Sequence, residues 1–260
     1  MSSFTQTMRT GLLVAIALLT GCASYTVPGG PAPLGALGAT KADQAINTAP
    51  SLLKYYNAKP LATFPAMIAV ARVQSSGYQS RTAEGYGIGA YTVITTRDVE
   101  DDASMAKLNA LPKVQAVAPI SRLLLPQTTR DEDDLRAAAA RVKADMLLIY
   151  TFDTKFYTKD FAAPVTLITL GLSPNHRAYV TTTCSAILMD VRSGYIYGGA
   201  EATEKSDQIA NGWTTDDAVD DTRLRTERAS FKKMTAELEG EWTRILATYA
   251  KESSTTVPTN

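Results

Sequence analysis

Few side chains in this sequence are suited to nucleophilic, acid–base or metal chemistry. Its 260 residues include one histidine, His176, and two cysteines, Cys22 and Cys184. A hydrolytic triad or a cysteine–histidine pair would have to use His176, because imidazole is the usual base at neutral pH. Its surroundings contain a proline and an asparagine and predict a loop, whereas Cys184 lies in an alternating, strand-like stretch. We therefore expect a solvated His176 and a small, buried Cys184.

Acidic residues are the other candidates for chemistry. A pair of carboxylates that cleaves glycosidic bonds stays open as an alternative, since nothing among the 26 Asp and Glu residues singles out a pair. The run 131–134 lacks the alternating acids and the glycine of a calcium loop. It precedes a helical pattern, as do the acids at 216–221, so these acids are expected to cap helices. The sequence predicts neither a metal site nor a cofactor.

One glycine-rich stretch is similar in composition to phosphate-binding loops. Gly85, Gly87 and Gly89 lead straight into the strand-forming residues 91–96. A phosphate loop must open a helix, whose N-terminus binds the anion. We therefore expect a hairpin connection at this stretch.

The composition excludes several classes of protein. With 45% hydrophobic and 20% charged residues, the chain can bury a core and is not disordered throughout. The formal net charge of +0 argues against nucleic acid as a partner, because phosphate binding needs a basic surface. Two cysteines exclude a scaffold held by several disulfides.

The N-terminus has the pattern of a signal peptide over residues 1–21. Arg9 is followed by the nine-residue apolar run 11–19. A membrane-spanning helix needs about 20 apolar residues, so this run is too short to remain as an anchor. Two other interpretations are a signal peptide that is cleaved elsewhere and a short membrane helix.

The residues Leu19, Thr20, Gly21 and Cys22 resemble the lipobox of bacterial lipoproteins. The resemblance implies diacylglycerol on the Cys22 thiol, cleavage before this residue, and acylation of the new amine by a fatty acid such as palmitate. Several acyl chains give a stable membrane anchor. No aspartate follows Cys22, which by the sorting rule for such lipoproteins implies the outer membrane, with the protein facing the periplasm.

The mature chain is expected to contain one folded domain. Residues 22–60 are predicted to be the lipidated cysteine and a flexible linker, 61–252 an α/β domain, and 253–260 a disordered tail. Apolar runs and turn signals predict strands and helices through this domain. We expect strands at 66–73, 91–96, 114–125 and 145–152, helices at 98–111 and 131–142, a hairpin over 179–204, and a long helix from 215. Apolar residues recur in this last helix at steps of three and four and predict a buried stripe: Phe231, Met234, Leu238, Trp242, Ile245 and Tyr249.

The order of these elements behind a lipobox resembles the curli-secretion lipoproteins and the related periplasmic lipoproteins that activate penicillin-binding proteins. The matching segments are 144–149 and 186–194, which ends in Asp190-Val191-Arg192-Ser193-Gly194. The resemblance implies a compact α/β (α+β) domain, with a mixed sheet flanked by helices, that acts by protein contact. The channel family also carries two long membrane insertions. Here 155–177 corresponds to the first, but 206–215 is only a short polar connection, which argues against a pore.

In one uncharged stretch of the mature chain, the apolar residues do not recur with the period of a buried helix or strand face. Three interpretations stay open for it: a segment that covers the sheet, an exposed apolar patch for a partner or the membrane, and a reduced membrane hairpin. As a patch it would comprise Phe161, Val165, Leu167, Ile168, Leu170 and Leu172.

These observations favour a non-catalytic, lipid-anchored lipoprotein that binds another envelope protein. The alternatives are an oligomeric, channel-like secretion subunit, in which the chain is a homo-oligomer, and a periplasmic hydrolase that uses carboxylates.

Overall fold

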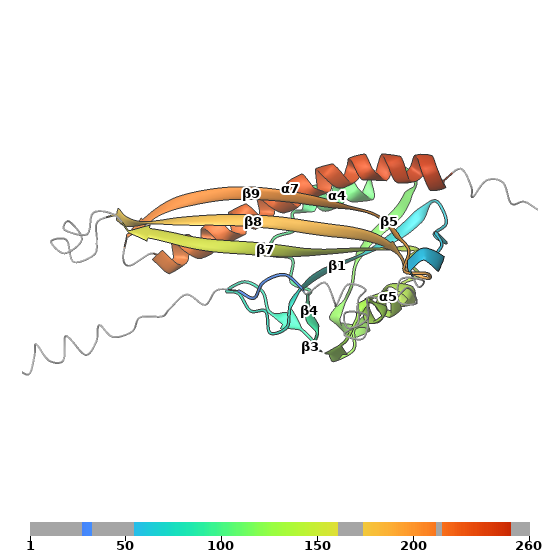
Figure 1. The fold of residues 1–260 in the computed structure, drawn as a ribbon, viewed down its shortest axis with the longest axis horizontal. Helices are drawn as coiled ribbons and strands as arrows, with labels where there is room; N and C mark the ends of the chain where they lie inside the picture. The colour runs from blue at the N-terminus through green and yellow to red at the C-terminus, as the bar shows by residue number, and fades with distance from the viewer. Residues whose placement is uncertain (1–27, 33–54, 161–173, 212–214, 251–260) are drawn as a thin grey trace, which may run out of the picture.

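The protein is built on one seven-stranded mixed sheet with helices on its faces (Figure 1). The computed structural model describes residues 28–32, 55–160, 174–211 and 215–250. The strand order is β2-β4-β1-β7-β8-β9, and β5 pairs with β1. The strands of this sheet are β1 (Ala66–Ser75), β2 (Gly85–Tyr86), β4 (Tyr91–Ile94), β5 (Val114–Pro119), β7 (Met146–Asp160), β8 (Pro174–Asp190) and β9 (Ile196–Asn211).

The centre of the sheet is the parallel pair β1 and β7, whose register places Ile68 opposite Met146. The paired segments, Ile68–Ala71 and Met146–Ile149, are continuous apolar runs, as expected for strands that are covered on both faces. On the other edge of β1, β5 pairs in parallel and β4 pairs antiparallel with its last residues. The strands predicted at the start of the domain and after position 145 are therefore confirmed.

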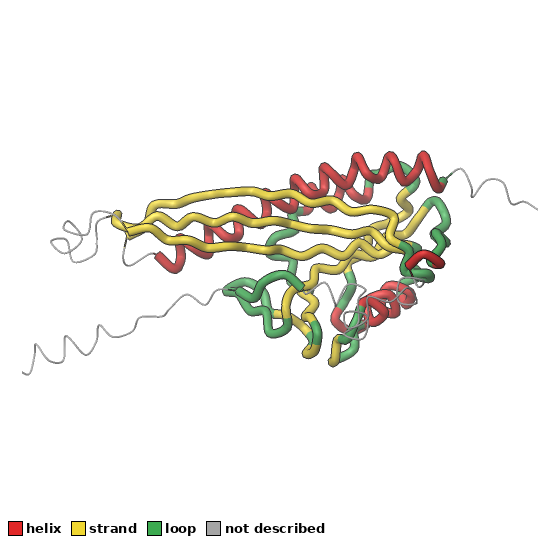
Figure 2. Tube along the Cα trace, viewed as in Figure 1, coloured by secondary structure: helices red, strands yellow, loops and turns green. Residues whose placement is uncertain are grey.

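Three long antiparallel strands extend beyond this centre, and we call β7, β8 and β9 together the blade (Figure 2). The predicted hairpin is confirmed, with its tight turn at 191–194 between β8 and β9. The strands are longer than predicted, because β7 and β8 continue in register until Asp160 faces His176. Strands of 15 to 17 residues span about 50 Å.

The long C-terminal helix α7 (Thr215–Tyr249) lies along one face of the blade, as Figure 1 shows. Its 35 residues span about 52 Å, so helix and blade match in length. The predicted apolar stripe is confirmed in the C-terminal half of the helix, where these residues are buried: Phe231, Met234, Leu238, Trp242 and Ile245.

Two shorter helices complete the layers. Helix α4 (Asp102–Asn109) packs on the same side as α7, and α5 (Glu132–Arg141) covers the other face of β1 and β7. Asp131 is the N-cap of α5 and accepts a hydrogen bond from the backbone N–H of Asp133, which confirms the predicted capping role. The sheet is thus covered on both faces near β1.

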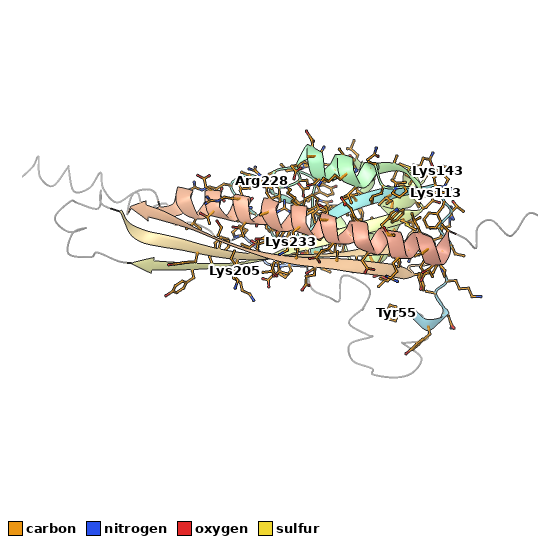
Figure 3. The ribbon with its side chains drawn as sticks, turned by 90° about the horizontal axis from the view of Figure 1, so that it is seen from above. Tyr55, Lys113, Lys143, Lys205, Arg228 and Lys233 are labelled. Atoms are coloured by element: carbon orange, nitrogen blue, oxygen red, sulfur yellow. The ribbon has the colours of Figure 1, made fainter. Side chains whose placement is uncertain are left out.

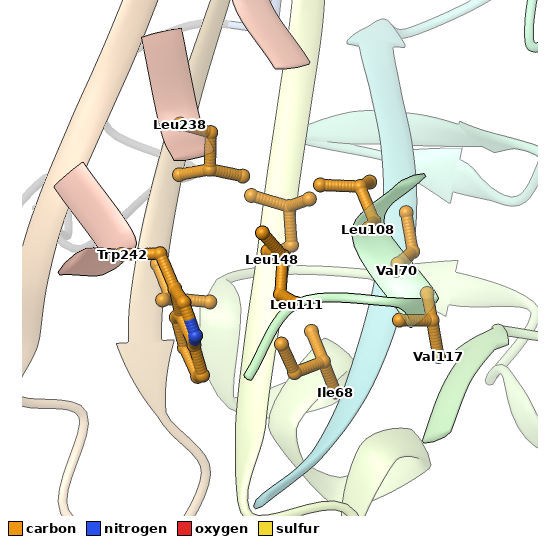
Figure 4. Close-up of a pocket in the computed structure, with 9 residues that line it drawn as sticks. Ile68, Val70, Leu108, Leu111, Val117, Leu148, Leu238 and Trp242 are labelled. Atoms are coloured by element: carbon orange, nitrogen blue, oxygen red, sulfur yellow. The ribbon is translucent and has the colours of Figure 1, made fainter. Parts of the chain in front are cut away.

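The core between β1, β7, α4 and α7 is closely packed. Figure 4 shows the apolar side chains around a cavity of only about 10 Å³. The indole N–H of Trp242 donates to the carbonyl of Pro112 at 2.8 Å, so the one polar atom of this ring is satisfied.

Three sequence predictions differ from the structure. The expected helix at 98–111 begins only at Asp102, since Asp98 and Glu100 form buried ion pairs. The strand expected at 114–125 ends at Pro119, and a short 3-10 helix, η2 (Arg122–Leu124), follows it. The glycine-rich connection itself contains β2 and a further strand, β3 (Ile88–Gly89), which pairs with β6 (Thr128–Thr129).

Part of the segment expected to be a linker, 22–60, lies on the folded domain. We call residues 28–32 the strap. Pro31 forms an antiparallel bridge with Gln74, and the carbonyl of Gly30 accepts from the N–H of Ser75 at 3.0 Å. The N–H of Ala32 donates to the Thr151 hydroxyl at 3.2 Å. The chain is thus fixed to the sheet six residues after Cys22.

Candidate functional site

The lipobox residues Leu19, Thr20, Gly21 and Cys22 lie outside the described residues, and so does the tail 253–260. The same holds for the predicted patch of Phe161, Val165, Leu167, Ile168, Leu170 and Leu172. The flanking strands end at Asp160 and begin at Pro174. No described helix is both long and apolar enough to cross a membrane.

The histidine and the second cysteine do not form a reactive pair. His176 lies in β8, in register with Asp160, so the predicted loop around it is wrong: the pairing of β8 with β9 extends the strand to Pro174. Cys184 is on the same strand, eight residues away, which is about 27 Å along the backbone. Cys184 is buried as predicted, and burial raises the pKa of its thiol well above its ordinary value.

Beyond the part near the β8–β9 turn that α5 covers and the part that the strap contacts, the face of the blade opposite α7 is not covered by any described element. We call this the open face. Two cross-strand hydrogen bonds order it, one between the hydroxyls of Thr183 and Thr203 at 2.8 Å and one from Ser185 to Glu201 at 2.7 Å. Toward the end of the blade, the rings of Tyr157 and Tyr179 pack at 6.0 Å between centroids. The exposed charges alternate in sign along it, with Asp153, Lys155, Glu201 and Lys205.

A hollow of about 490 Å³ lies on the open face. The strap forms one wall with Pro31 and Ala32, and the floor consists of β7, β8 and β9 side chains that include Thr151, Ser185 and Glu201. The lining therefore offers hydroxyl and carboxylate groups beside apolar atoms. Such a lining can recognise a polar surface by hydrogen bonds.

On the opposite face, a buried ion cluster joins α7 to the sheet. Its centre is Arg72 of β1, whose side chain is 1% exposed. One guanidinium nitrogen lies 2.7 Å from Asp98 and 3.8 Å from Glu100, and the other lies 3.7 Å from Glu227 of α7. The guanidinium also stacks over the Phe152 ring, 4.9 Å from its centroid.

Helix α7 completes the cluster with Arg223. This side chain contacts Glu227 at 2.7 Å and Asp220 at 3.1 Å, and it donates to Thr82 at 3.2 Å. Glu227 also accepts from the hydroxyl of Thr154 at 3.0 Å. Strands, loop and helix are thus held by charge-assisted hydrogen bonds, which are stronger than neutral ones.

Burial and the neighbouring charges together shift the pKa values of the groups in the cluster. Burial raises the pKa of Glu227, and the nearby Arg223 and Arg72 offset this only in part. Burial lowers the pKa of Arg72, but the charges of Glu227 and Glu100 outweigh it, so this pKa is raised. Burial, followed by the charge of Glu100, raises the pKa of Tyr150, which donates to Glu100. Burial also lowers the pKa of Arg223, but the charges of Glu227 and its neighbours outweigh it, so this pKa is raised. Both arginines and the tyrosine are therefore protonated at neutral pH.

A second hollow, of about 540 Å³, lies beside residues 97–102. All four of its carboxylates have partners: Asp98 and Glu100 pair with Arg72, Asp102 pairs with Arg97, and Asp101 accepts from Ser104. In Glu100 the Oε1 atom accepts from Tyr150, whereas Oε2 has no described partner. In the described part of the chain, no group of three or more His, Cys, Asp or Glu side chains could hold a metal.

The two segments that carry the family resemblance meet at one end of the sheet. Asp190 accepts from the N–H groups of Arg192 and Ser193 and from that of Leu61. Arg192 in turn lies 3.2 Å from Asp145 and donates to the Leu61 carbonyl. In this chain the motif residues therefore close the β8–β9 turn and fix the segment before β1.

The ion cluster was not predicted from the sequence, although two signals for it were present. Arg72 is the single charge in an apolar run, so its side chain had to be buried with a partner. Arg223 and Glu227 lie eight and four residues before Phe231, so they continue the buried side of α7 with charged residues.

Comparisons with known proteins find only distant similarity. No family model and no curated protein sequence matches the chain. A Helicobacter pylori protein named as a neuraminyllactose-binding hemagglutinin homolog aligns with TM-score 0.34 and 11% identity, over 75% of this chain and 93% of its own. A PelC dodecamer from Paraburkholderia phytofirmans aligns with 0.30 and 11%, over 68% and 89%. The C-terminal domain of LpoB from Escherichia coli aligns with 0.26 and 14%, over 60% and 94%. TM-scores below 0.5 do not establish a common function.

Proposed function

We propose that the chain is a lipoprotein of the outer membrane that faces the periplasm and acts, without catalysis, by binding another envelope protein. The lipid on Cys22 places it at the membrane, and the blade presents the binding surface. The observation that carries the binding role is the open face. Beyond the parts that α5 and the strap cover, the blade is covered on the α7 face alone within the described chain, so its other face is available to a partner.

The chemistry of the open face suits a protein partner. Its threonine, serine and tyrosine side chains donate and accept hydrogen bonds, and its charges are of both signs, as in the polar part of a protein interface. Cross-strand hydrogen bonds hold these groups in fixed positions, so binding costs little side-chain entropy. The hollow beside the strap gives the surface a concave part.

The binding role is tested by site-specific photocrosslinking in whole cells. A photoreactive residue at Thr203, on the open face, is expected to capture one envelope protein. The matched control is Thr243, an exposed threonine on α7. Equal adducts from both positions, or none from Thr203, would contradict the open face as the binding surface.

Lipid attachment is tested with the two cysteines of the chain as a matched pair. Metabolic labelling with a fatty acid is expected to mark the wild-type protein and the Cys184→Ala variant and to leave Cys22→Ala unlabelled. Label that persists in Cys22→Ala would show that lipidation at this position is wrong.

We also propose that the apolar segment with Phe161, Val165, Leu167, Ile168, Leu170 and Leu172 takes part in the contact. In the sequence it follows the last residue of β7 and precedes the first residue of β8. The double substitution Leu167→Asp with Leu170→Asp separates the alternatives: an unchanged melting temperature with weaker partner or membrane association would support the contact. Unfolding of this variant would instead identify a segment that covers the core, because buried charges cost several kcal/mol (~3 or more).

A second candidate partner is another copy of this chain. Strand β9 ends the sheet and pairs only with β8 among the described strands. Such an edge can pair with a strand of another subunit. Native mass spectrometry of detergent extracts would show a ring or dimer if this candidate is right and a monomer if it is wrong.

A further inference from the structure

The strap limits how far the domain can move from its lipid anchor. If all of 22–60 were free, about 38 residues would separate lipid and domain and allow a reach beyond 100 Å. Instead, the bridge of Pro31 with Gln74 and the hydrogen bond of Ala32 to Thr151 fix the strap, residues 28–32, to the sheet. Six peptide units from Cys22 to Pro28 span at most about 22 Å.

The strap also has a direction along the blade. Because Ala71 faces Ile149 in the parallel pair, Gln74 and its bridge partner Pro31 lie at the level of Phe152. The N–H of Phe152 accordingly donates to the Gln74 side chain at 3.3 Å. We call the end of the blade at Asp160 and Pro174 its free end, and the end at the 191–194 turn its turn end. The strap is antiparallel to β1, so the direction from Pro31 to Pro28 points toward the free end.

The number of residues between two positions on the strands gives their distance along the blade. Counting about 3.3 Å per residue, Pro28 lies about 30 Å from the level of Asp190, at the turn end of the blade. It lies only about 17 Å from the level of Asp160, at the free end. A tether of about 22 Å reaches past the free end but not past the turn end.

We infer that the strap orients the domain, with the free half of the blade next to the lipid bilayer and the 190–194 turn pointing away from it. This inference rests on the proposed lipid on Cys22. The occupant of the space beside the free half is the membrane surface that carries this lipid. The turn end, with Leu61 and Tyr55, faces the periplasm in this orientation (Figure 3).

Energy transfer to labelled membranes tests the orientation. A fluorophore is attached to Tyr157→Cys, near the free end, or to Leu61→Cys, near the turn. Both side chains are exposed, 63% and 49%, so neither substitution disturbs the core. Both are made in the lipidated, full mature chain with Cys184→Ala. The vesicles contain phosphatidylethanolamine and phosphatidylglycerol with an acceptor on the headgroup.

Transfer from position 157 is expected to exceed that from position 61 by about twofold or more, since the two levels differ by about 37 Å. Insertion of a long Gly/Ser segment between Val27 and Pro28 is expected to abolish the difference. Equal transfer from both positions, with vesicle binding intact, would overturn the orientation alone. Failure of every variant to bind vesicles would overturn lipid anchoring and the orientation with it.

Discussion

Replacement of Arg72 by methionine tests the buried ion cluster most directly. The side chain is 1% exposed and faces Asp98, Glu100 and Glu227 at 2.7 to 3.8 Å. Methionine preserves much of its volume but removes its charge and leaves three carboxylates without their central partner. Breaking a buried ion pair in this way costs about 3–5 kcal/mol, because the remaining charge stays desolvated. We therefore expect Arg72→Met to lower the free energy of unfolding by about this amount.

Arg97 provides the matched control. It pairs with Asp102 at 2.9 Å, but the two side chains are 44% and 98% exposed. An exposed pair contributes about 0–1 kcal/mol, so Arg97→Met is expected to change stability by less than ~1 kcal/mol.

The assay is urea unfolding of residues 22–260 with Cys22 replaced by serine, followed by circular dichroism. A third variant combines Arg72→Met with Asp98→Asn and Glu100→Gln, and it is expected to recover part of the loss because fewer unpaired charges are buried. The reasoning would be refuted if Arg72→Met and Arg97→Met cost the same, or if the triple variant were less stable than Arg72→Met.

Three further predictions concern single residues. Burial raises the pKa of Asp101, but hydrogen bonds from Ser104 outweigh it and hold this pKa below its ordinary 3.8; Asp101→Ala should therefore cost about 1 kcal/mol at pH 7. Because the folded-state pKa is the lower one, this difference should vanish as the pH falls through it, and a pH-independent difference in urea unfolding would contradict the capping role. Gly89 has φ +137°, and an added Cβ would clash with the Thr129 carbonyl oxygen, so Gly89→Ala should lower stability by about 2 kcal/mol or more; an unchanged melting temperature would refute this. Because burial raises the pKa of the Cys184 thiol, a thiol reagent should modify it only after unfolding, and rapid labelling of the folded protein would show that this site is accessible.

The sequence predicted those elements whose buried side chains are apolar. The C-terminal half of α7 has its stripe from Phe231 to Ile245 against an apolar core, so its period of three and four residues predicted both the helix and the buried side chains. The N-terminus of α5 was predictable as well, because Asp131 precedes an alanine-rich helical run.

The free half of the blade was not predictable in the same way. Its side toward α7 is lined by Thr154, Thr182 and the charges of the ion cluster, and its open face carries further hydroxyl groups. Both faces are polar, so the alternation between apolar and polar residues that indicates a strand is absent there. The strap was also hidden, since its contacts are made by backbone groups of glycine and proline residues that are typical of a linker.

The ion cluster has a geometric consequence for the open face. An apolar helix packed on a threonine-lined surface has no unique position along it, because apolar contacts are not directional. Charged contacts are directional: a shift of α7 by one turn, about 5.4 Å, would separate Glu227 from both Arg72 and Thr154. The same Arg72 holds the loop with Asp98, so strand, loop and helix share one register. If the cluster sets this register, the variant that combines Arg72→Met with Asp98→Asn and Glu100→Gln should recover part of the stability but lose the single crosslink from Thr203. An unchanged crosslink would show that the cluster does not set the shape of the binding surface.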